Sequence, residues 1–348
     1  MVANKPKDTT VLLGHGSGGL MMKRIIDEVF YEAYGGELLL EGNDAANLPL
    51  PEFEKGDTLA FSTDSFVVSP LFFPETNIGR LAVCGTVNDV ATSGAVPKYL
   101  SCAFILEEGF PVDDLKKICA SMAEASREAG VTIVTGDTKV VGRGNADGVF
   151  INTSGVGVIK AGVNLSGANC KPGDKVILSG TLGDHGITIM STRESLNFSV
   201  DLKSDAAPLN HMMQAVLRVA PSVRCFRDPT RGGLSSTLNE LADQSQCDFS
   251  IREDLVPVKD VVRGACEMLG YDVFQVANEG KIVCVVSAEE ANVALEAMKN
   301  SEYGSDAAII GECVALRTES KPAVYLETSF GSSRILDMLV GEQLPRIC

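Results

Sequence analysis

The stretch at residues 131–159, VTIVTGDTKVVGRGNADGVFINTSGVGVI, contains two apolar runs separated by a glycine-rich polar segment. Both runs, 131–141 and 148–159, are rich in valine, isoleucine and threonine, residue types that favour β-strands. The glycines between the runs are typical of a turn. The sequence therefore predicts two strands joined by a glycine-rich turn.

A helix is predicted immediately before the first of these strands. Over 114–129 the apolar residues recur at helical intervals, and Leu115, Ile118 and Met122 share one face. Gly130 follows as a typical C-terminal stop, because glycine readily adopts the left-handed conformation that ends a helix.

Further helices and strands are predicted on both sides of this unit. They comprise helices over 20–34, 209–220 and 289–300, a helix that follows Gly233, and strands over 58–68, 174–180 and 281–287. Mixed helices and strands in two successive runs predict an α+β fold.

The chain of 348 residues is longer than one core usually holds, so two domains are expected. A weak internal repeat supports this, because EKGDTLAFST at 54–63 resembles KPGDKVILSG at 171–180. We predict an N-terminal domain over 1–163, a C-terminal domain over 164–335, and a mobile tail over 336–348 that ends in a reactive cysteine.

The net charge of −16 gives the chain an acidic surface. Such a field repels phosphate backbones, so nucleic acid and anionic membranes are poor partners, although bound magnesium could still mediate between acidic side chains and a nucleotide. No segment has the length of a membrane span, and the first ten residues lack the apolar run of a signal peptide. We therefore expect a cytoplasmic protein.

The ten cysteines show no CxxC pattern, and none pairs with a histidine at zinc-ligand spacing. Five are surrounded by apolar residues, as is typical of reduced cysteines in a core: Cys84, Cys102, Cys119, Cys266 and Cys284. Cys348 differs, because it is the last residue and has no apolar run around it. The tail either ends there by accident or serves to carry this sulfur.

Five aspartates occur beside glycine, serine or threonine in settings that resemble loops: Asp44, Asp64, Asp89, Asp137 and Asp228. Carboxylates at strand ends can hold magnesium, which takes nucleotide phosphates and waters as its other ligands. Any single one of them is better explained by a turn or a helix cap. Together they favour a magnesium site, to which Arg231 at a helix start could add an anion contact.

The loop VLLGHGSGG at 11–19 precedes a predicted helix. Backbone amides at such a helix start suit anions, which makes Gly16 and Gly18 candidates for a nucleotide contact, and His15 could touch a phosphate. The loop lacks the lysine of a P-loop and does not fit the dinucleotide fingerprint, so a flexible turn is an equal alternative. The other two histidines are expected to have structural roles.

Lys139 and Glu279 lie in stretches made largely of apolar residues and glycines, GDTKVVGRG at 136–144 and ANEGKIV at 277–283. Burial would lower the pKa of the lysine and raise that of the glutamate, so both could transfer protons near neutral pH. A simple ion pair between the two residues is the alternative.

The motifs together resemble the HypE carbamoyl dehydratases of [NiFe]-hydrogenase maturation, within the PurM-like ATP-dependent superfamily. The resemblance is carried by GHGSGG, STDSFVVSPLFFP, NDVATSGAVP, GDTKVV, RDPTRGGL, NEGKIV and the terminal PRIC, and it extends over essentially the whole chain. The terminal Pro-Arg-Ile-Cys is its most specific element.

The resemblance implies that ATP and Mg²⁺ are used to dehydrate a carbamoyl group on Cys348 to a thiocyanate, with Glu279 and Lys139 as proton acceptors. It implies nucleotide contacts from Gly16, Gly18, Asp64, Asn88, Asp89, Asp137, Thr138 and Arg231, with metal ligands among the five aspartates. It further implies a homodimer paired through β-rich N-terminal domains, a C-terminal α/β domain, and as partners the carbamoyltransferase HypF and the HypC–HypD complex.

Two other functions are weighed against this one. Another enzyme of the superfamily, such as a selenophosphate synthetase or a purine-pathway ligase, is possible, but a selenophosphate synthetase carries its cysteine in the N-terminal glycine-rich region. Here the first cysteine is Cys84. A non-enzymatic scaffold with a redox-active tail cysteine would leave the aspartates and the glycine-rich loop unexplained.

Overall fold

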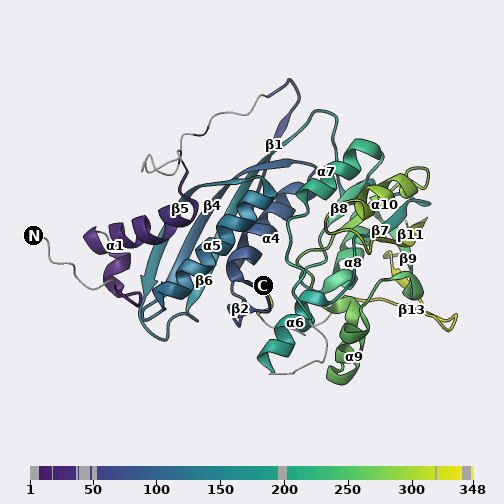
Figure 1. Cartoon of the computed structure of the whole chain (residues 1–348). Coiled ribbons are helices and arrows are strands. Elements are labelled where there is room, and N and C mark those ends of the chain that lie inside the picture. Colours follow the sequence, from purple (N-terminus) through teal and green to yellow (C-terminus); the bar gives the residue numbers. More distant parts are fainter. Residues whose placement is uncertain are drawn as a thin grey trace, which may run out of the picture.

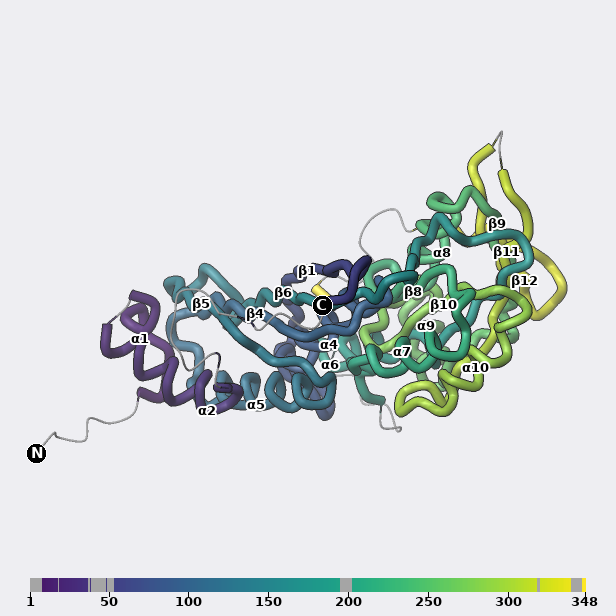
Figure 2. Tube along the Cα trace, turned by 90° about the horizontal axis from the view of Figure 1, so that it is seen from above, coloured from purple at the N-terminus to yellow at the C-terminus, as the bar shows by residue number. Residues whose placement is uncertain are grey.

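Two β-sheets lie side by side in the computed structural model, one from each half of the chain (Figure 1). The structure describes residues 8–17, 19–36, 38, 48, 53–194, 202–317, 320–338 and 346–348. Seen from the side and from above, the C-terminal residue lies between the two sheets (Figure 2). The predicted two-domain α+β class is confirmed, whereas the domain boundaries at 163 and 335 stay predictions.

The N-terminal sheet has four strands in the order β1-β6-β4-β5. They are β1 (Thr58–Phe66), β4 (Val96–Glu107), β5 (Thr132–Val141) and β6 (Val149–Ile159), and two short strands, β2 (Phe72–Phe73) and β3 (Thr76–Asn77), pair beside the sheet. The two strands predicted over 131–159 are confirmed as β5 and β6. They are not neighbours, however, because β4 lies between them, parallel to β5 and antiparallel to β6.

The glycine-rich turn between β5 and β6 crosses the end of β4, and a single carboxylate fixes it there. Glu107 at the end of β4 accepts hydrogen bonds from the backbone N–H groups of Gly144 and Gly148. These bonds lower the pKa of Glu107 below its usual value. Gly144 and Gly148 both have φ of +81°, a conformation that glycine adopts without strain.

Helices α4 (Ile78–Thr92) and α5 (Val112–Ala129) cover one face of this sheet (Figure 1). The predicted helix over 114–129 is confirmed as α5, and Gly130 ends it with φ of +70°. Helix α4 has no counterpart among the predicted elements. It is buried on nearly every side, so its apolar residues do not follow the one-sided spacing that identifies a surface helix.

The helix predicted over 20–34 is confirmed as a continuous helical run. It consists of α1 (Gly19–Ile25), a π-helical stretch (Ile26–Tyr31) and α2 (Glu32–Tyr34), and it ends before Gly35. Its buried residues Val29 and Phe30 join the core beneath α5, where the ring of Phe30 lies 5.0 Å from that of Phe104.

The C-terminal sheet has seven strands in the order β13-β12-β9-β11-β7-β10-β8. The strands are β7 (Lys175–Leu178), β8 (Cys225–Arg227), β9 (Cys247–Arg252), β10 (Val283–Val286), β11 (Ala308–Leu316), β12 (Val324–Glu327) and β13 (Ser333–Ile335). The helices are α6 (Asp184–Arg193), α7 (Asn210–Val219), α8 (Gly233–Ser245), α9 (Asp260–Leu269) and α10 (Ala291–Lys299). The predicted elements β7, β10, α7, α8 and α10 are confirmed.

The two halves are joined where the segment before α7 contacts α4. The side chain of Asn88 donates to the carbonyl of Ala207 at 3.0 Å and accepts from the N–H of Leu209 at 2.7 Å. Arg80 adds a bond of 2.8 Å from Nε to the carbonyl of Ala206. These contacts fix residues 206–209 against α4.

All ten cysteines are free, and all except Cys348 are buried. The core positions predicted for five of them are therefore confirmed: Cys84, Cys102, Cys119, Cys266 and Cys284. Burial raises the pKa of Cys84 to about 12, so this thiol is protonated at neutral pH. Over the described ranges, no helix is both long and apolar enough to cross a bilayer.

Candidate active site

A cavity of about 680 Å³ lies between the two halves of the molecule. Its lining brings together side chains from distant parts of the sequence: Asp64 from β1, Asp89 from α4, Asp228 after β8, Arg231 before α8, Glu279 before β10, and the C-terminal Cys348. Three of the five predicted aspartates are thus gathered beside the predicted glutamate and the terminal thiol.

The predicted loop settings of the aspartates are wrong for three of the five. Asp64 and Asp137 lie within strands β1 and β5, and Asp89 lies in helix α4. Small and polar neighbours had suggested loops, yet here they allow close packing of α4 against the sheet, as where the Ser62 hydroxyl donates to Asp89 at 3.1 Å. Only Asp228 lies in a connecting segment, and Asp44 falls outside the described residues.

Negative charge is concentrated in the cavity. Burial, followed by the charges of Asp228 and Asp64, raises the pKa of Asp89 to about 7. Burial also raises the pKa of Asp228. Glu279 shows the same effect more strongly, since burial and then the charges of Asp228 and Asp205 hold its pKa well above the usual value. Bound cations would relieve this repulsion.

Glu279 is held by its backbone, while its carboxyl group is left available. Its N–H donates to Asp205 Oδ1 at 3.0 Å, and its carbonyl accepts from Asn88 Nδ2 at 3.4 Å. The Oε1 atom is buried and has no hydrogen-bond partner within the described structure. A side chain at Gly85 on α4 would meet the ring of Phe66 at 2.9 Å, so glycine at this position leaves space at the cavity wall.

Asn88 itself does not line the cavity, although it was expected to contact the cofactor. It is buried, and both ends of its side-chain amide are used by the backbone of the C-terminal half. Its observed contacts are therefore those of a structural link that also supports the backbone of Glu279.

The end of the tail is docked in this cavity. The N–H of Val67 donates to a terminal carboxylate oxygen of Cys348 at 3.1 Å, and the N–H of Ser69 donates to the carbonyl of Arg346 at 3.3 Å. Between these bonds, Ile347 is buried with the N-terminal core. Burial, followed by the charge of Glu279, raises the pKa of Cys348 to about 12, so the docked sulfur is a protonated thiol.

The side chain of Arg346 adds further contacts to the docked tail. It donates from Nε to the carbonyl of Val67 at 3.1 Å and forms an ion pair with Asp147 in the β5–β6 turn. Arg193 of α6 donates to the carbonyls of Ser69 and Arg346. The last three residues are thus fixed by contacts from both halves, whereas mobility of the tail stays a prediction.

The remaining predicted residues lie together elsewhere, on strand β5 and beside it. Lys139 forms an ion pair with Asp137, which lowers the pKa of that aspartate. Gly16 packs against the same strand so closely that an added Cβ would lie 2.7 Å from the backbone nitrogen of Val140. Thr138 is buried in β5, and Gly18 falls outside the described residues. The alternative of a Lys139–Glu279 ion pair is therefore wrong within this chain.

The three histidines differ in their surroundings. His15 is buried and accepts from the N–H of Leu12 at 2.9 Å. His211 is exposed and bonds the carbonyl of Glu128 at 3.1 Å. His185 is buried and bonds the carbonyl of Ile347 in the tail, a contact that sequence reasoning missed.

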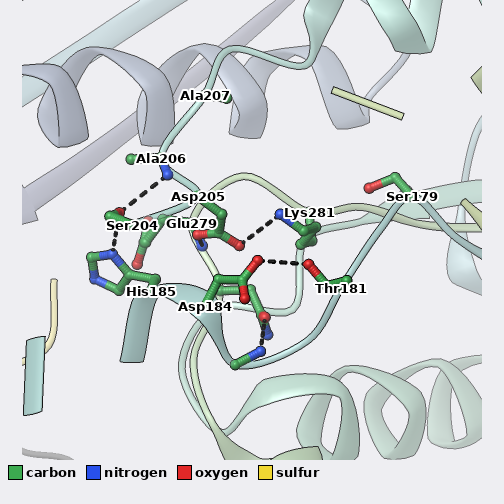
Figure 3. A network of polar contacts seen from close by, with 12 residues as sticks. Ser179, Thr181, Asp184, His185, Ser204, Asp205, Ala206, Ala207, Glu279 and Lys281 are labelled. Atoms are coloured by element: carbon green, nitrogen blue, oxygen red, sulfur yellow. Dashed lines mark hydrogen bonds and ion pairs between the residues drawn. The ribbon is translucent and has the colours of Figure 1, made fainter. Parts of the chain in front are cut away.

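Two charged residues behind Glu279 were also missed. Asp205 and Lys281 form a buried ion pair of 3.1 Å and appear together with Glu279 in Figure 3. Asp205 falls in no recognisable motif. Lys281 follows Glu279 by two residues in an otherwise apolar run, a signal that could have been used.

The carboxylates of the cavity could hold magnesium only together with other ligands. Among the described residues, no three acidic, histidine or cysteine side chains converge as a ready-made ligand set. Asp64, Asp89 and Asp228 nevertheless face one cavity, where their charges act on one another. Mg²⁺ commonly takes only one or two carboxylates and completes its shell with phosphate oxygens and water.

Fold and cavity define a two-domain protein of the AIR synthase related class. The model of the N-terminal domain of AIR synthase related proteins matches residues 42–159, and that of the C-terminal domain matches 171–320. The chain is 52% identical to the carbamoyl dehydratase HypE of Azotobacter vinelandii, over 98% of both proteins. It belongs to the HypE family of carbamoyl dehydratases, as its motifs suggested.

Solved structures agree with this assignment. A crystal structure of the hydrogenase maturation protein HypE in complex with ATP superimposes with a TM-score of 0.93 at 47% identity, covering 97% of this chain and all of that one. A chain from a crystal structure of the HypE–HypF complex superimposes with a TM-score of 0.78 at 50% identity, covering 90% of this chain and 99% of that one.

Proposed function

We propose that this carbamoyl dehydratase uses ATP to convert a carbamoyl group on Cys348 into a thiocyanate, which supplies the cyanide ligand for the iron of a [NiFe]-hydrogenase. The observation that carries the proposal is the terminal thiol docked in an acidic cavity beside Glu279. The ATP complex of a HypE at 47% identity supports the choice of nucleotide.

The carbamoyl oxygen is a poor leaving group, so the proposed reaction first phosphorylates it. The carbamoyl oxygen attacks the γ-phosphorus of ATP and ADP departs, while one N–H proton is lost to leave an S-linked imidate that carries the phosphoryl group. Loss of the second N–H proton then forms the carbon–nitrogen triple bond and expels phosphate. Oxygen ends in phosphate, nitrogen and carbon stay on sulfur, and two protons pass to a base.

Glu279 is the candidate for that base. Its carboxyl lines the cavity that holds the sulfur, and its Oε1 has no other partner among the described residues. Its raised pKa suits a group that must accept a proton from nitrogen. Adding ATP to the carbamoylated protein should remove the mass of one water from the C-terminal peptide, and an unchanged peptide mass would contradict the proposal.

Asp64, Asp89 and Asp228 are the candidates for holding magnesium, with Arg231 beside them as an anion contact. When bound, the ion would neutralise the charge of the phosphates during transfer. The carboxylates keep the cavity negative and orient its polar lining, as Asp89 does by accepting from Ser62.

Magnesium-dependent ATP binding should weaken as the pH falls through about 7. The raised pKa of Asp89 means that its carboxyl is largely protonated below this value and must lose a proton to bind a cation. Calorimetry about one unit below and one unit above pH 7 measures the effect, and the affinity should differ about tenfold between these two pH values, because the deprotonated fraction of Asp89 differs by that factor. Asp89→Asn should bind weakly at both values, whereas Asp254→Asn, at an exposed pair with Arg252, should behave like the wild type.

We propose a homodimer built through the open face of the N-terminal sheet. Helices α4 and α5 cover the opposite face, while Leu59, Phe61 and Ile105 of the open face are exposed by 59%, 70% and 43%. Lys139 is the register partner of Ile105 and so belongs to the same face. The β5 stretch with Asp137, Thr138 and Lys139 would then contribute to a nucleotide site shared between two copies.

Phe61→Glu should weaken this dimer by roughly 100-fold or more, because symmetry buries the aromatic ring twice. Light scattering at matched concentrations reports the mass. Met268→Glu is the matched control, since Met268 is 74% exposed on α9 in the other half. A monomeric wild type, or an unaffected Phe61→Glu dimer, would contradict this arrangement.

The partners follow from the chemistry of the tail. We propose that HypF carbamoylates Cys348 after the tail leaves the cavity, since the docked thiol is protonated, and that the HypC–HypD complex receives the cyano group. The HypE–HypF complex of a relative at 50% identity supports the first contact. Nine reduced, buried cysteines fit a reducing compartment, so we place the reaction in the cytoplasm.

A further inference from the structure

His185 connects the tail to the interior of the C-terminal half. The residue lies in α6 with no exposed surface, and its Nε2 is 2.7 Å from the carbonyl oxygen of Ile347. Its Nδ1 is 2.8 Å from the hydroxyl of Ser204, and Phe73 packs edge-on against the ring at 5.8 Å. A carbonyl can only accept, so Nε2 carries the hydrogen and Nδ1 accepts from Ser204.

The loop Ser204–Ala206 contacts both His185 and the backbone of Glu279 (Figure 3). Ser204 holds His185 and also accepts from the N–H of Ala206 at 3.2 Å. Asp205, the residue between them, accepts from the backbone N–H of Glu279 at 3.0 Å. One short loop thus orients the group that holds the tail and the backbone of the candidate base.

The contact between His185 and the tail is unlike an ordinary core hydrogen bond. Its acceptor lies next to the residue that must leave the cavity to receive a carbamoyl group. Departure of the tail leaves the Nε2 hydrogen buried without its partner, a costly state that favours return. Burial lowers the pKa of His185, so the ring stays a neutral donor near neutral pH.

We propose that His185 and the Ser204–Ala206 loop form a latch that positions the sulfur of Cys348 against Glu279. His185 and Ser204 are positioning residues: they act through the tail and do not touch the carbamoyl group. The effect of the latch on catalysis rests on the proposed dehydration, whereas its effect on docking of the tail does not.

The docking of the tail can be measured by alkylating Cys348 with iodoacetamide at mildly alkaline pH and following the C-terminal peptide by mass spectrometry. The other nine cysteines are buried, so the reaction reports how often the tail leaves the cavity. His185→Phe keeps a ring against Phe73 but loses both hydrogen bonds, and should raise the alkylation rate roughly tenfold. His185→Gln can still donate to Ile347 and should restore a rate within about twofold of the wild type.

Two further variants complete this test. Ser204→Ala removes only the bond that orients His185 and should raise alkylation roughly threefold. His211→Phe is the control. It replaces an exposed histidine on α7 whose hydrogen bond is to Glu128 and not to the tail, so the alkylation rate should stay unchanged. Wild-type alkylation rates in both Ser204→Ala and a folded His185→Phe would overturn the latch. If His185→Phe does not fold, the rate of Ser204→Ala decides.

Single-turnover dehydration of the carbamoylated variants distinguishes an effect on the position of the Cys348 sulfur from an effect on docking of the tail alone. Ser204→Ala and His185→Phe should dehydrate more slowly at saturating ATP, with the half-saturating ATP concentration unchanged and with rescue by His185→Gln. Faster alkylation combined with an unchanged dehydration rate would overturn the positioning role. A wild type that fails to dehydrate would instead contradict the proposed function, and the alkylation rates would still test the latch.

Discussion

Replacing Glu279 by glutamine should lower the rate of dehydration roughly 100- to 10,000-fold while ATP binding is retained, as expected when a general base is lost. The substitution preserves the size of the side chain and the backbone bond to Asp205. It removes the buried carboxyl group that lines the cavity beside Cys348. Single-turnover mass spectrometry of the carbamoylated protein measures the rate, and calorimetry measures the binding of ATP.

The rate of dehydration should also fall as the pH is lowered. Because the pKa of Glu279 is raised, its carboxylate form is lost as the pH falls through that raised value, and the wild-type rate should fall with it. The glutamine variant should lack this acidic limb. Glu312→Gln, on β11 and paired with Lys175, is a carboxylate control outside the cavity and should keep the full rate. Near-normal dehydration by Glu279→Gln would exclude Glu279 as the base.

Replacing Cys348 by alanine should abolish thiocyanate formation completely. In the proposed reaction the sulfur is the point of covalent attachment, so no other group can substitute for it. ATP binding should persist, because the carboxylates of the cavity come from other elements: Asp64, Asp89 and Asp228. Mass spectrometry after incubation with a carbamoyl donor system and ATP measures the product.

The matched control for this variant is another cysteine. Cys266→Ala on α9 removes a thiol that is buried away from the cavity and should leave thiocyanate formation intact at the cost of some stability. Thiocyanate on any residue of Cys348→Ala would contradict the role of the tail.

Local sequence patterns were sufficient to predict many of the helices and strands. The β-branched runs of β5 and β6 and the one-sided spacing of α5 are properties of short segments, so they could be predicted from the sequence. The order of the strands could not, because the insertion of β4 between β5 and β6 depends on contacts between distant residues. Helix α4 was not predicted, because a helix that is buried on nearly every side has no polar face to reveal its helical period.

The sequence motifs identified most residues of the candidate site, but they did not show which of these residues lie together. Motifs identified Asp64, Asp89, Asp228, Glu279 and Cys348, which the fold brings to one cavity. They also identified Asp137 and Lys139, which lie on β5 and do not line this cavity, because a motif does not show where the fold places its residues.

Sequence reasoning did not identify the contacts made by His185 and Asp205. Neither residue lies in a recognisable motif, and both are buried. Their contacts with Ile347 and Glu279 join residues far apart in the chain, so only the folded structure reveals them.

Phosphorylation of the carbamoyl group is tested by following its oxygen atom. The protein is carbamoylated on Cys348 with isotopically heavy oxygen and then supplied with ATP and magnesium in ordinary water. The heavy oxygen should appear in inorganic phosphate, in step with loss of one water from the C-terminal peptide. Release of the label into water, with unlabelled phosphate, would contradict phosphorylation of the carbamoyl oxygen and with it the central claim.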